Sequence, residues 1–410
     1  MYGLVLEGGG AKGSYQIGAV KALYEMGYKF DTITGTSIGA INGAFLALGK
    51  IDEAYSIWEN AELSKAINTD KETFTKLLNF DIKTKDISKI LNYIIETVRN
   101  GGLDITPLRK LLNDNIDEEE IRNSDINFGL ITVSFTDANP IEVFIKDIPK
   151  GKLIDYIIAS ASLPIFKLDK IDGKSYIDGG FYDNCPINLM SETGIKDIIT
   201  IEIAGAGIKR KIKKDDLNII RIRPSRKIAR TIEVNPEITK KGIMYGYLDA
   251  YKVIKKLYGT KYYIKIEENE EKFINEILKL SDKKIKKIYK LFNFEGRVNK
   301  KNVFEIILPI LGRMLKMEDD YSYMDLFIRF NEKIAEYLLI DEMKIYEFNE
   351  FNRMISEKMD FNESISFNST YKYIPFMHLP QQIELLPKNV IKKILTKLFI
   401  IYYGEEWKYA

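Results

Sequence analysis

Hydrophobic residues in the first fifty positions follow strand-like and helix-like patterns in turn. Gly3–Leu6 is a short apolar run before a row of glycines, as expected of a buried parallel strand. Ser14–Gly27 places its apolar residues mainly on one face of a helix that ends in glycine. Thr32–Thr34 predicts a second strand, and Ile38–Leu48 predicts a second helix that ends at Gly49. The chain is therefore predicted to begin with two strand–turn–helix units.

The pattern changes once along the rest of the chain. Residues 51–123 are mostly helical in character, and further strands are predicted at 128–133, 141–145, 175–177, 198–201 and 218–222. Strands separated by helical stretches predict one α/β layered domain over residues 1–258. Beyond Gly259 glycines become rare, Lys, Ile, Leu and Tyr dominate, and the periodicity is helical. Residues 259–410 are therefore predicted to form an all-helical C-terminal region.

Composition narrows the classes of function. The 410 residues are 45% hydrophobic and 29% charged, which is typical of a globular protein. Lys and Arg number 61 against 59 Asp and Glu, so net charge gives no reason to expect nucleic acid as a partner. The single cysteine, Cys185, forbids an intramolecular disulfide, and the single histidine, His378, excludes zinc sites built from several imidazoles. No basic-then-apolar leader is present at the N-terminus, which favours a cytoplasmic location.

Gly8–Gly13 (GGGAKG) lies between the first predicted strand and the first predicted helix. Glycines allow a tight turn there and present backbone N–H groups at a helix N-terminus, which favours an anion. The same residues satisfy the dinucleotide fingerprint G-x-G-x-x-G, with Asp31 about twenty residues further on. That alternative gives no role to Ser37, the serine in the next predicted turn. It also places Asp31 before its strand, whereas a ribose-binding acid stands at the end of a strand.

Gly35–Gly39 (GTSIG) matches the nucleophile-elbow pattern G-x-S-x-G in the predicted strand–turn–helix context. The turn is sharp enough that Gly35 and Gly39 are needed, and its strain exposes the Ser37 hydroxyl. A right-handed crossover would bring this elbow and the glycine loop to the same carboxyl edge of the sheet. The loop amides could then stabilise the oxyanion formed when Ser37 attacks a carbonyl, an effect of about 3–4 kcal/mol per donor.

A serine nucleophile needs a base. His378 lies in an apolar stretch bracketed by prolines, which is more typical of a packed structural residue. Asp178 is a stronger candidate, because it ends a predicted strand directly before Gly179 and Gly180. Its carboxylate would have to lie within about 2.6–3.2 Å of the Ser37 hydroxyl. Since the ordinary pKa of Asp is about 3.9, Asp178 would also have to be buried to act as a base.

Four motifs in this order resemble the patatin-like phospholipase family: the glycine loop, the elbow, Ala159–Pro164 (ASASLP) and Asp178–Gly180. The resemblance covers roughly residues 1–258 and implies a three-layer domain with a central, mostly parallel sheet. It implies a Ser–Asp catalytic dyad. Within its third motif, Ala159–Ser162 is predicted to form a close-packed turn that lines the site. The implied site residues are Ser37 and Asp178 as the dyad, Gly8, Gly9, Gly10, Lys12 and Gly13 as the oxyanion hole, Gly35 and Gly39 as the elbow, and Gly179 and Gly180 as the base loop.

The resemblance implies a serine lipid acyl hydrolase of the phospholipase A or lysophospholipase kind. Such an enzyme cleaves phospholipids or related acyl lipids through an acyl-enzyme on Ser37, without a metal or organic cofactor. A non-catalytic lipid-binding or regulatory protein on the same fold stays open as an alternative. A Ser37–Asp178–His378 triad esterase is a second alternative, although α/β-hydrolases place several strands before the elbow. Cys185 could suggest a thiol nucleophile, but its surroundings favour a small buried residue.

Two basic amphipathic stretches lie in the C-terminal region, Lys283–Lys290 and Lys388–Tyr402. Helices packed on a neighbouring domain, with solvated lysines, account for this pattern. Peripheral docking on an anionic membrane is the functional alternative, in which each lysine contributes about 1 kcal/mol. The region is also compatible with a lid over the site or with pairing of two subunits in a homo-oligomer.

Overall fold

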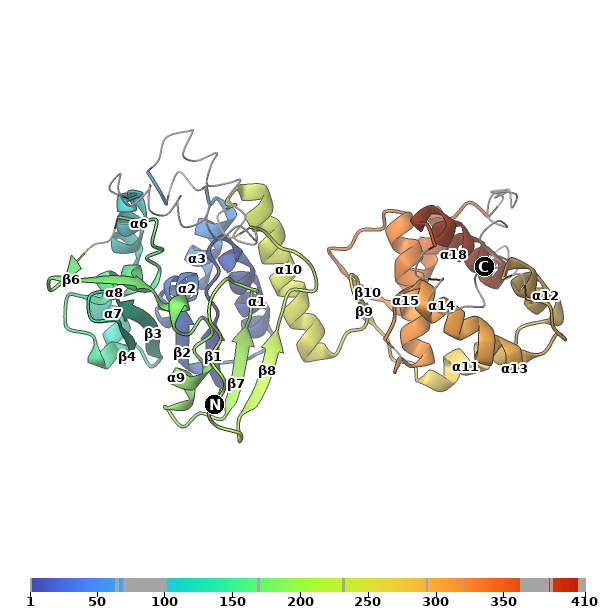
Figure 1. Cartoon of the computed structure of the whole chain (residues 1–410), viewed down its shortest axis with the longest axis horizontal. Helices are drawn as coiled ribbons and strands as arrows, with labels where there is room; N and C mark the ends of the chain where they lie inside the picture. Colours follow the sequence, from blue (N-terminus) through green and yellow to red (C-terminus); the bar gives the residue numbers. More distant parts are fainter. Residues whose placement is uncertain are drawn as a thin grey trace. The chain divides into compact units, whose positions relative to one another are not determined.

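The computed structural model describes residues 2–62, 66–68, 102–167, 170–230, 233–292, 294–318, 320–361, 383 and 386–404. The chain divides into two compact units, Met1–Lys255 and Lys256–Ala410 (Figure 1). Each unit has its own set of helices and strands, and His378 lies outside the described residues.

The first unit is built on an eight-stranded mixed sheet of order β5-β6-β3-β2-β1-β7-β8, with β4 also paired to β3. Pairing is parallel from β3 through β2, β1 and β7 to β8, and antiparallel where β4, β5 and β6 join. The predicted mostly parallel sheet is therefore confirmed. The strands are β1 Tyr2–Leu6, β2 Phe30–Thr36, β3 Asn127–Ser134, β4 Asn139–Phe144, β5 Lys170–Ile171, β6 Lys174–Asp178, β7 Asp197–Ile201 and β8 Asn218–Ile222.

Helices cover both faces of this sheet, as alternate residues of β2 show. Ile33 points toward α2, because a Cβ on Gly43 would lie 3.3 Å from its Cγ2. Thr34 points the other way and donates a hydrogen bond to the carbonyl oxygen of Pro186, directly before α9 (3.2 Å). The predicted three layers are thus helices, sheet and helices. The helices are α1 Gly13–Glu25, α2 Ile38–Ala47, α3 Ile51–Glu59, α6 Thr106–Asn115, α7 Glu118–Arg122, α8 Leu153–Ser160, α9 Ile187–Ser191 and α10 Pro236–Lys255.

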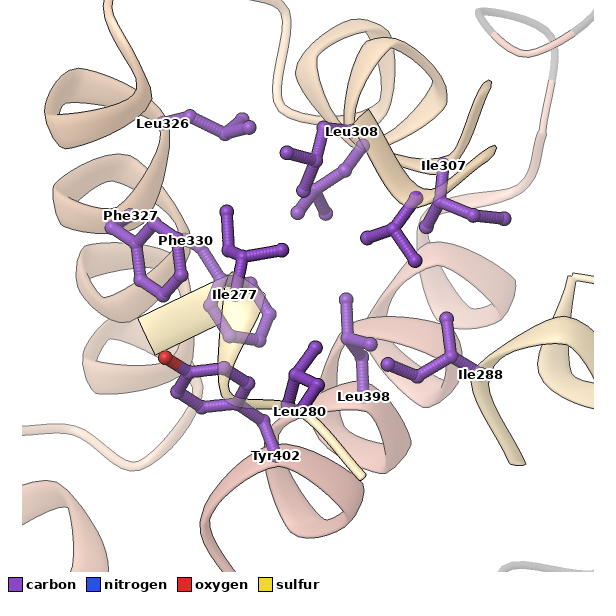
Figure 2. Close-up of a pocket in the computed structure, with 12 residues that line it drawn as sticks. Ile277, Leu280, Ile288, Ile307, Leu308, Leu326, Phe327, Phe330, Leu398 and Tyr402 are labelled. Carbon is purple, nitrogen blue, oxygen red and sulfur yellow. The ribbon is translucent and has the colours of Figure 1, made fainter. Parts of the chain in front are cut away.

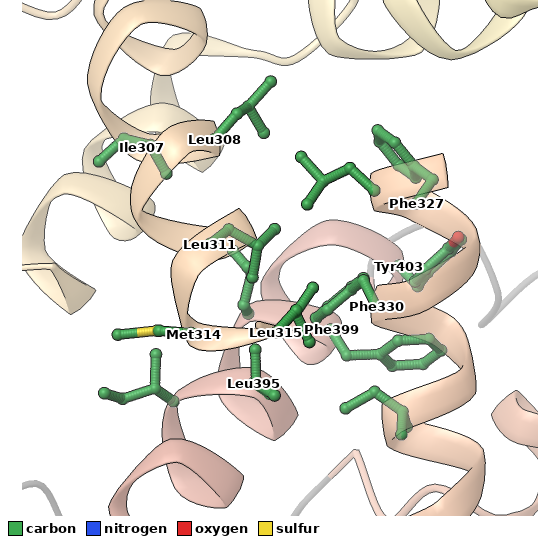
Figure 3. Packing of buried hydrophobic residues seen from close by; sticks show 14 of the residues in the cluster. Ile307, Leu308, Leu311, Met314, Leu315, Phe327, Phe330, Leu395, Phe399 and Tyr403 are labelled. Atoms are coloured by element: carbon green, nitrogen blue, oxygen red, sulfur yellow. The ribbon is translucent and has the colours of Figure 1, made fainter. Parts of the chain in front are cut away.

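The second unit is mostly helical and has a large hydrophobic core of its own. Figure 3 shows part of it, where Phe330 of α15 and Phe399 of α18 lie across from Leu311 of α14. The helices are α11 Glu270–Leu278, α12 Asp282–Leu291, α13 Lys300–Asn302, the π-helical turn η5 Val303–Ile307, α14 Leu308–Met314, α15 Tyr323–Tyr337, α16 Phe348–Lys358 and α18 Lys388–Tyr403.

One feature of this unit corrects the expectation of an all-helical region. β9 (Tyr263–Lys265) and β10 (Ile345–Glu347) form a two-stranded parallel sheet. Each strand is three residues long and the two lie far apart in the sequence, so no local pattern predicts their pairing. The pairing is stabilised within the core of the unit, where the side chains of Tyr263 and Tyr346 are fully buried.

A small apolar pocket lies among the helices of this unit (Figure 2). Leu326, Phe327 and Phe330 of α15 line one side of it, and Leu398 and Tyr402 of α18 line another. Tyr402 is the one lining side chain with a polar atom, and its hydroxyl donates to Glu276 (2.8 Å). The other lining side chains are hydrocarbon, so the walls are apolar. Of the helices in the described part of the chain, none combines the length and apolar character needed to cross a bilayer.

Candidate active site

The elbow serine lies between the sheet and α2. Ser37 follows the last residue of β2 and caps the N-terminus of α2 with φ 57° and ψ −125°, a left-handed conformation that is strained for a residue other than glycine. The glycines on either side permit this turn. A Cβ on Gly35 would lie 2.6 Å from the Ala40 nitrogen, and one on Gly39 would lie 2.8 Å from the Leu6 carbonyl carbon.

Asp178 reaches the elbow through the register of three strands. Thr36 of β2 pairs with Ile131 of β3, and the next residue of β3, Thr132, pairs with Asp178 at the end of β6. The Asp178 carboxylate accepts a hydrogen bond from the Gly180 amide (2.7 Å), and the Ser37 side chain lies near enough to stabilise its ionised form. The two residues of the predicted dyad, far apart in the sequence, therefore lie in contact.

Burial changes the chemistry of this carboxylate. Only 4% of Asp178 is exposed, and the loss of hydration raises its pKa from 3.8 to about 6. Ser37 and the Gly180 amide oppose this rise but do not cancel it. Asp178 is therefore a stronger base than an exposed aspartate, yet it is still mainly ionised at neutral pH.

The glycine loop lies directly against the elbow. A Cβ on Gly8 would lie 3.1 Å from the Ser37 Cβ, so the main chain passes close to the serine. Gly10 adopts φ +59°, which turns the loop into α1. Lys12 and Gly13 contact other parts of the unit. The Lys12 ammonium donates to the Ala204 carbonyl (2.6 Å), and Gly13 packs against Trp58 and the elbow residue that follows Ser37.

Residues 160–162, predicted only to form a turn lining the site, also contact both Ser37 and Asp178. The Ser37 amide donates to Ser160 Oγ (3.0 Å), and the Asp178 amide donates to the Ser162 carbonyl (2.8 Å). The Ser162 hydroxyl in turn donates to the carbonyl of Ile158 in α8 (2.7 Å). The positions of the serine and the aspartate are thus fixed from the same segment.

Asn184 lies at the site, and the sequence alone assigned it no role there. Its carbonyl accepts from the Gly8 amide (2.9 Å), and its Nδ2 donates to the Gly8 carbonyl (3.1 Å). A Cβ on Gly180 would lie 2.8 Å from Asn184 Oδ1, so this side chain packs between the glycine loop and the base loop. The signal in the sequence was a polar residue in the turn before Pro186.

Cys185 was the remaining candidate nucleophile. Cys185 is buried, and burial raises the pKa of its thiol well above its ordinary value, so the thiol stays protonated and unreactive. Within the described residues, no group of three or more His, Cys, Asp or Glu side chains is arranged to hold a metal ion.

The fold and site define a three-layer α/β domain with a serine elbow, a buried aspartate and a glycine loop on one edge of its sheet. Residues 4–190 match the family model described as patatin-like phospholipase. This part of the chain is therefore a patatin-like phospholipase domain, and the resemblance predicted from the four motifs is confirmed.

Curated relatives share this domain. Neuropathy target esterase sws of Drosophila melanogaster is 28% identical over 205 residues. Patatin-like phospholipase domain-containing protein 7 of Mus musculus is 30% identical over 203 residues, and the domain-containing protein 6 of Homo sapiens is 28% identical over 203. Each alignment covers 49% of this chain but only 13% of the relative.

Two solved structures align with most of the chain at low identity. VipD from Legionella pneumophila aligns over 97% of this chain and 90% of its own, with 16% identity and a TM-score of 0.41. The type III effector protein ExoU aligns over 97% of this chain and 76% of its own, with 14% identity and a TM-score of 0.33.

Proposed function

We propose that this protein is a serine lipid acyl hydrolase in which Ser37 is the nucleophile and Asp178 is the base. The observation that carries the proposal is a strained elbow serine placed beside a buried carboxylate, whose ionised form it stabilises, and next to a loop of glycines. Neither a second carboxylate nor an imidazole is needed for the proton transfer that this arrangement supports.

The reaction follows from these positions. Ser37 Oγ attacks the ester carbonyl carbon and passes its proton to Asp178, while amides of the loop beginning at Gly8 stabilise the oxyanion. Collapse of the tetrahedral intermediate breaks the ester bond, and the alcohol leaves with the proton held by Asp178. Water then attacks the acyl-enzyme carbonyl and gives a proton to Asp178. When the bond between the acyl group and Ser37 Oγ breaks, Asp178 passes that proton to Ser37 Oγ and the fatty acid leaves.

Phospholipids or related acyl lipids are the proposed substrates, in keeping with the family of the domain. The test is mass spectrometry of the products formed from mixed phospholipid vesicles by the wild-type protein and by Ser37→Ala. The wild type is expected to release free fatty acid and lysophospholipid, and the variant neither. Vesicle binding without any release by the wild type would instead support a non-catalytic lipid-binding protein.

The pH dependence of the rate is expected to follow the ionisation of Asp178. Its pKa is raised to about 6, and only the ionised carboxylate can accept the serine proton. Below pH 6, kcat/KM should therefore fall about tenfold per pH unit, and above about pH 7 it should be flat. Initial rates on a soluble ester between pH 4.5 and 9 check this prediction, and a profile with no inflection between pH 5 and 7 would contradict it.

We also propose that the second unit docks on anionic membrane surfaces. Helices α12 and α18 pack against each other, and Lys284 Nζ of the first donates to the Tyr402 carbonyl of the second (2.8 Å). Both helices expose further lysines, among them Lys286 and Lys290 on α12. Such lysines attract anionic headgroups by about 1 kcal/mol each near the surface.

Sedimentation with vesicles tests this docking. Binding to vesicles with a third phosphatidylserine should be strong at low salt and weaken at 0.5 M salt. Lys286→Glu/Lys290→Glu should weaken it about tenfold or more, whereas the matched pair Lys300→Glu/Lys301→Glu on α13 should change it little. Equal binding to neutral vesicles would rule out the electrostatic proposal.

A further inference from the structure

A buried acid stands directly before the glycine loop. Glu7 follows the last residue of β1, and its side chain is fully buried. Its carboxylate accepts hydrogen bonds from three successive amides after β7, those of Ile203 (2.5 Å), Ala204 (3.2 Å) and Gly205 (3.3 Å). An apolar strand that ends in a fully buried carboxylate is unusual, because burying a charge is costly unless it is paired.

The segment that Glu7 binds lies against the glycine loop. A Cβ on Gly9 would lie 2.7 Å from Ile203 Cδ1, and the Lys12 ammonium donates to the Ala204 carbonyl. The Glu7 carbonyl itself accepts from Gln16 Nε2 of α1 (2.7 Å). The course of the loop beside Ser37 is therefore set by contacts that converge on Glu7.

Lys209 supplies the charge that balances this acid. Its Nζ lies 3.0 Å from Glu7 Oε1 and 3.1 Å from Oε2 of Glu202, a second buried carboxylate. Glu202 has further cationic partners in Arg221 and Arg223, so its charge is compensated several times over. Lys209 is the cation whose ion pair with Glu7 the structure shows, and its side chain is 44% exposed.

We propose that Glu7 and Lys209 are a positioning pair for the oxyanion hole. Glu7 shapes the glycine loop, and Lys209 neutralises a negative charge that would otherwise oppose the developing oxyanion. Charges at short range in a poorly hydrated site interact far more strongly than in water, so an uncompensated carboxylate behind the loop would slow the chemical step. The inference rests on the proposed function, because it assigns these residues to the same reaction.

Steady-state kinetics of three variants on a soluble acyl ester test the pair. Lys209→Met leaves the carboxylate unbalanced, so kcat is expected to fall by about 10–100-fold with KM within about twofold. Glu7→Gln loses amide contacts but also the charge, and kcat should fall by about tenfold. The double variant Glu7→Gln/Lys209→Met should be faster than Lys209→Met alone, because no charge remains to be balanced.

Two further variants serve as controls. Lys196→Met breaks an exposed ion pair with Asp216 (2.7 Å) at the start of β7 and should leave kcat unchanged. Lys209→Arg keeps the positive charge and should retain kcat within about threefold. If Lys209→Met folds poorly, the kcat of Lys209→Arg still tests whether a cation at position 209 is sufficient.

The proposal would be overturned by an unchanged kcat in Lys209→Met, by a double variant slower than both single variants, or by equal losses in Lys209→Arg and Lys209→Met. If the wild type shows no turnover that depends on Ser37 in the same assay, the proposed hydrolase function itself is contradicted.

Discussion

Ser37→Ala is expected to lower kcat on an acyl ester by about 10⁴-fold or more. Alanine removes only the hydroxyl and keeps the backbone of the elbow, where residue 37 adopts φ 57°. The variant should therefore fold like the wild type and lose the nucleophile alone. Initial rates of p-nitrophenyl butyrate hydrolysis, with melting temperatures measured in parallel, check the expectation.

Ser191→Ala is the matched control for this loss. Ser191 is a buried serine of the same unit, and its hydroxyl donates to the Asn188 carbonyl in α9 (2.7 Å). Its removal should leave the rate within about threefold and reduce stability by about 1 kcal/mol. Comparable rate losses in both variants would mean that Ser37 acts through folding and not as the nucleophile.

Asp178→Asn is expected to lower kcat by about 10³-fold or more. Asparagine has nearly the same shape and can still accept the hydrogen bond from the Gly180 amide, but it cannot take a proton from Ser37. The loss should lie in kcat, with KM little changed, because the carboxylate acts in the chemical step. The same ester assay measures it.

The same substitution should make the protein more stable at neutral pH. Because burial raises the Asp178 pKa above its unfolded value of 3.8, the folded state disfavours the ionised form. Stability contributed by this group is therefore lost as the pH rises from about 4 to 6. The free energy of unfolding of Asp178→Asn, measured with urea, should exceed that of the wild type by up to about 3 kcal/mol at pH 8. This difference should disappear near pH 4.

Substitutions at Asp183 and His378 show whether the loss is specific to Asp178. Asp183 is equally buried, and burial raises its pKa to about 6 as well, but its carboxylate accepts from the amides of Cys185 and Arg210. Asp183→Asn should therefore keep the rate within about tenfold. His378→Ala should keep it within about twofold, whereas a loss equal to that of Asp178→Asn would favour the triad alternative.

The sequence predicted the parts of the site that have local patterns. Apolar runs followed by small residues marked the ends of β1, β2 and β6, so Gly8, Ser37 and Asp178 could be placed at strand ends. Their contact depends on the register of β2, β3 and β6, which involves residues far apart in the chain and carries no local signal.

The supporting residues were harder to predict for the same reason. Ser160 and Asn184 act through hydrogen bonds to the backbone of distant residues, and single polar residues have no periodicity to reveal such bonds. Glu7 had the clearest signal, a charged residue directly after an apolar strand, but its partners near Ile203 and at Lys209 are known only from the fold. The pairing of β9 with β10 was missed because both strands are very short.

Covalent trapping tests the Ser–Asp dyad most directly. A fluorophosphonate lipid analogue is incubated with the wild type and with Ser37→Ala, His378→Ala and Asp178→Asn, and labelled peptides are identified by mass spectrometry. The dyad predicts one adduct on Ser37, formed normally in His378→Ala, much more slowly in Asp178→Asn, and absent from Ser37→Ala. An adduct on another residue, such as Cys185, or undiminished labelling of Ser37→Ala would contradict it.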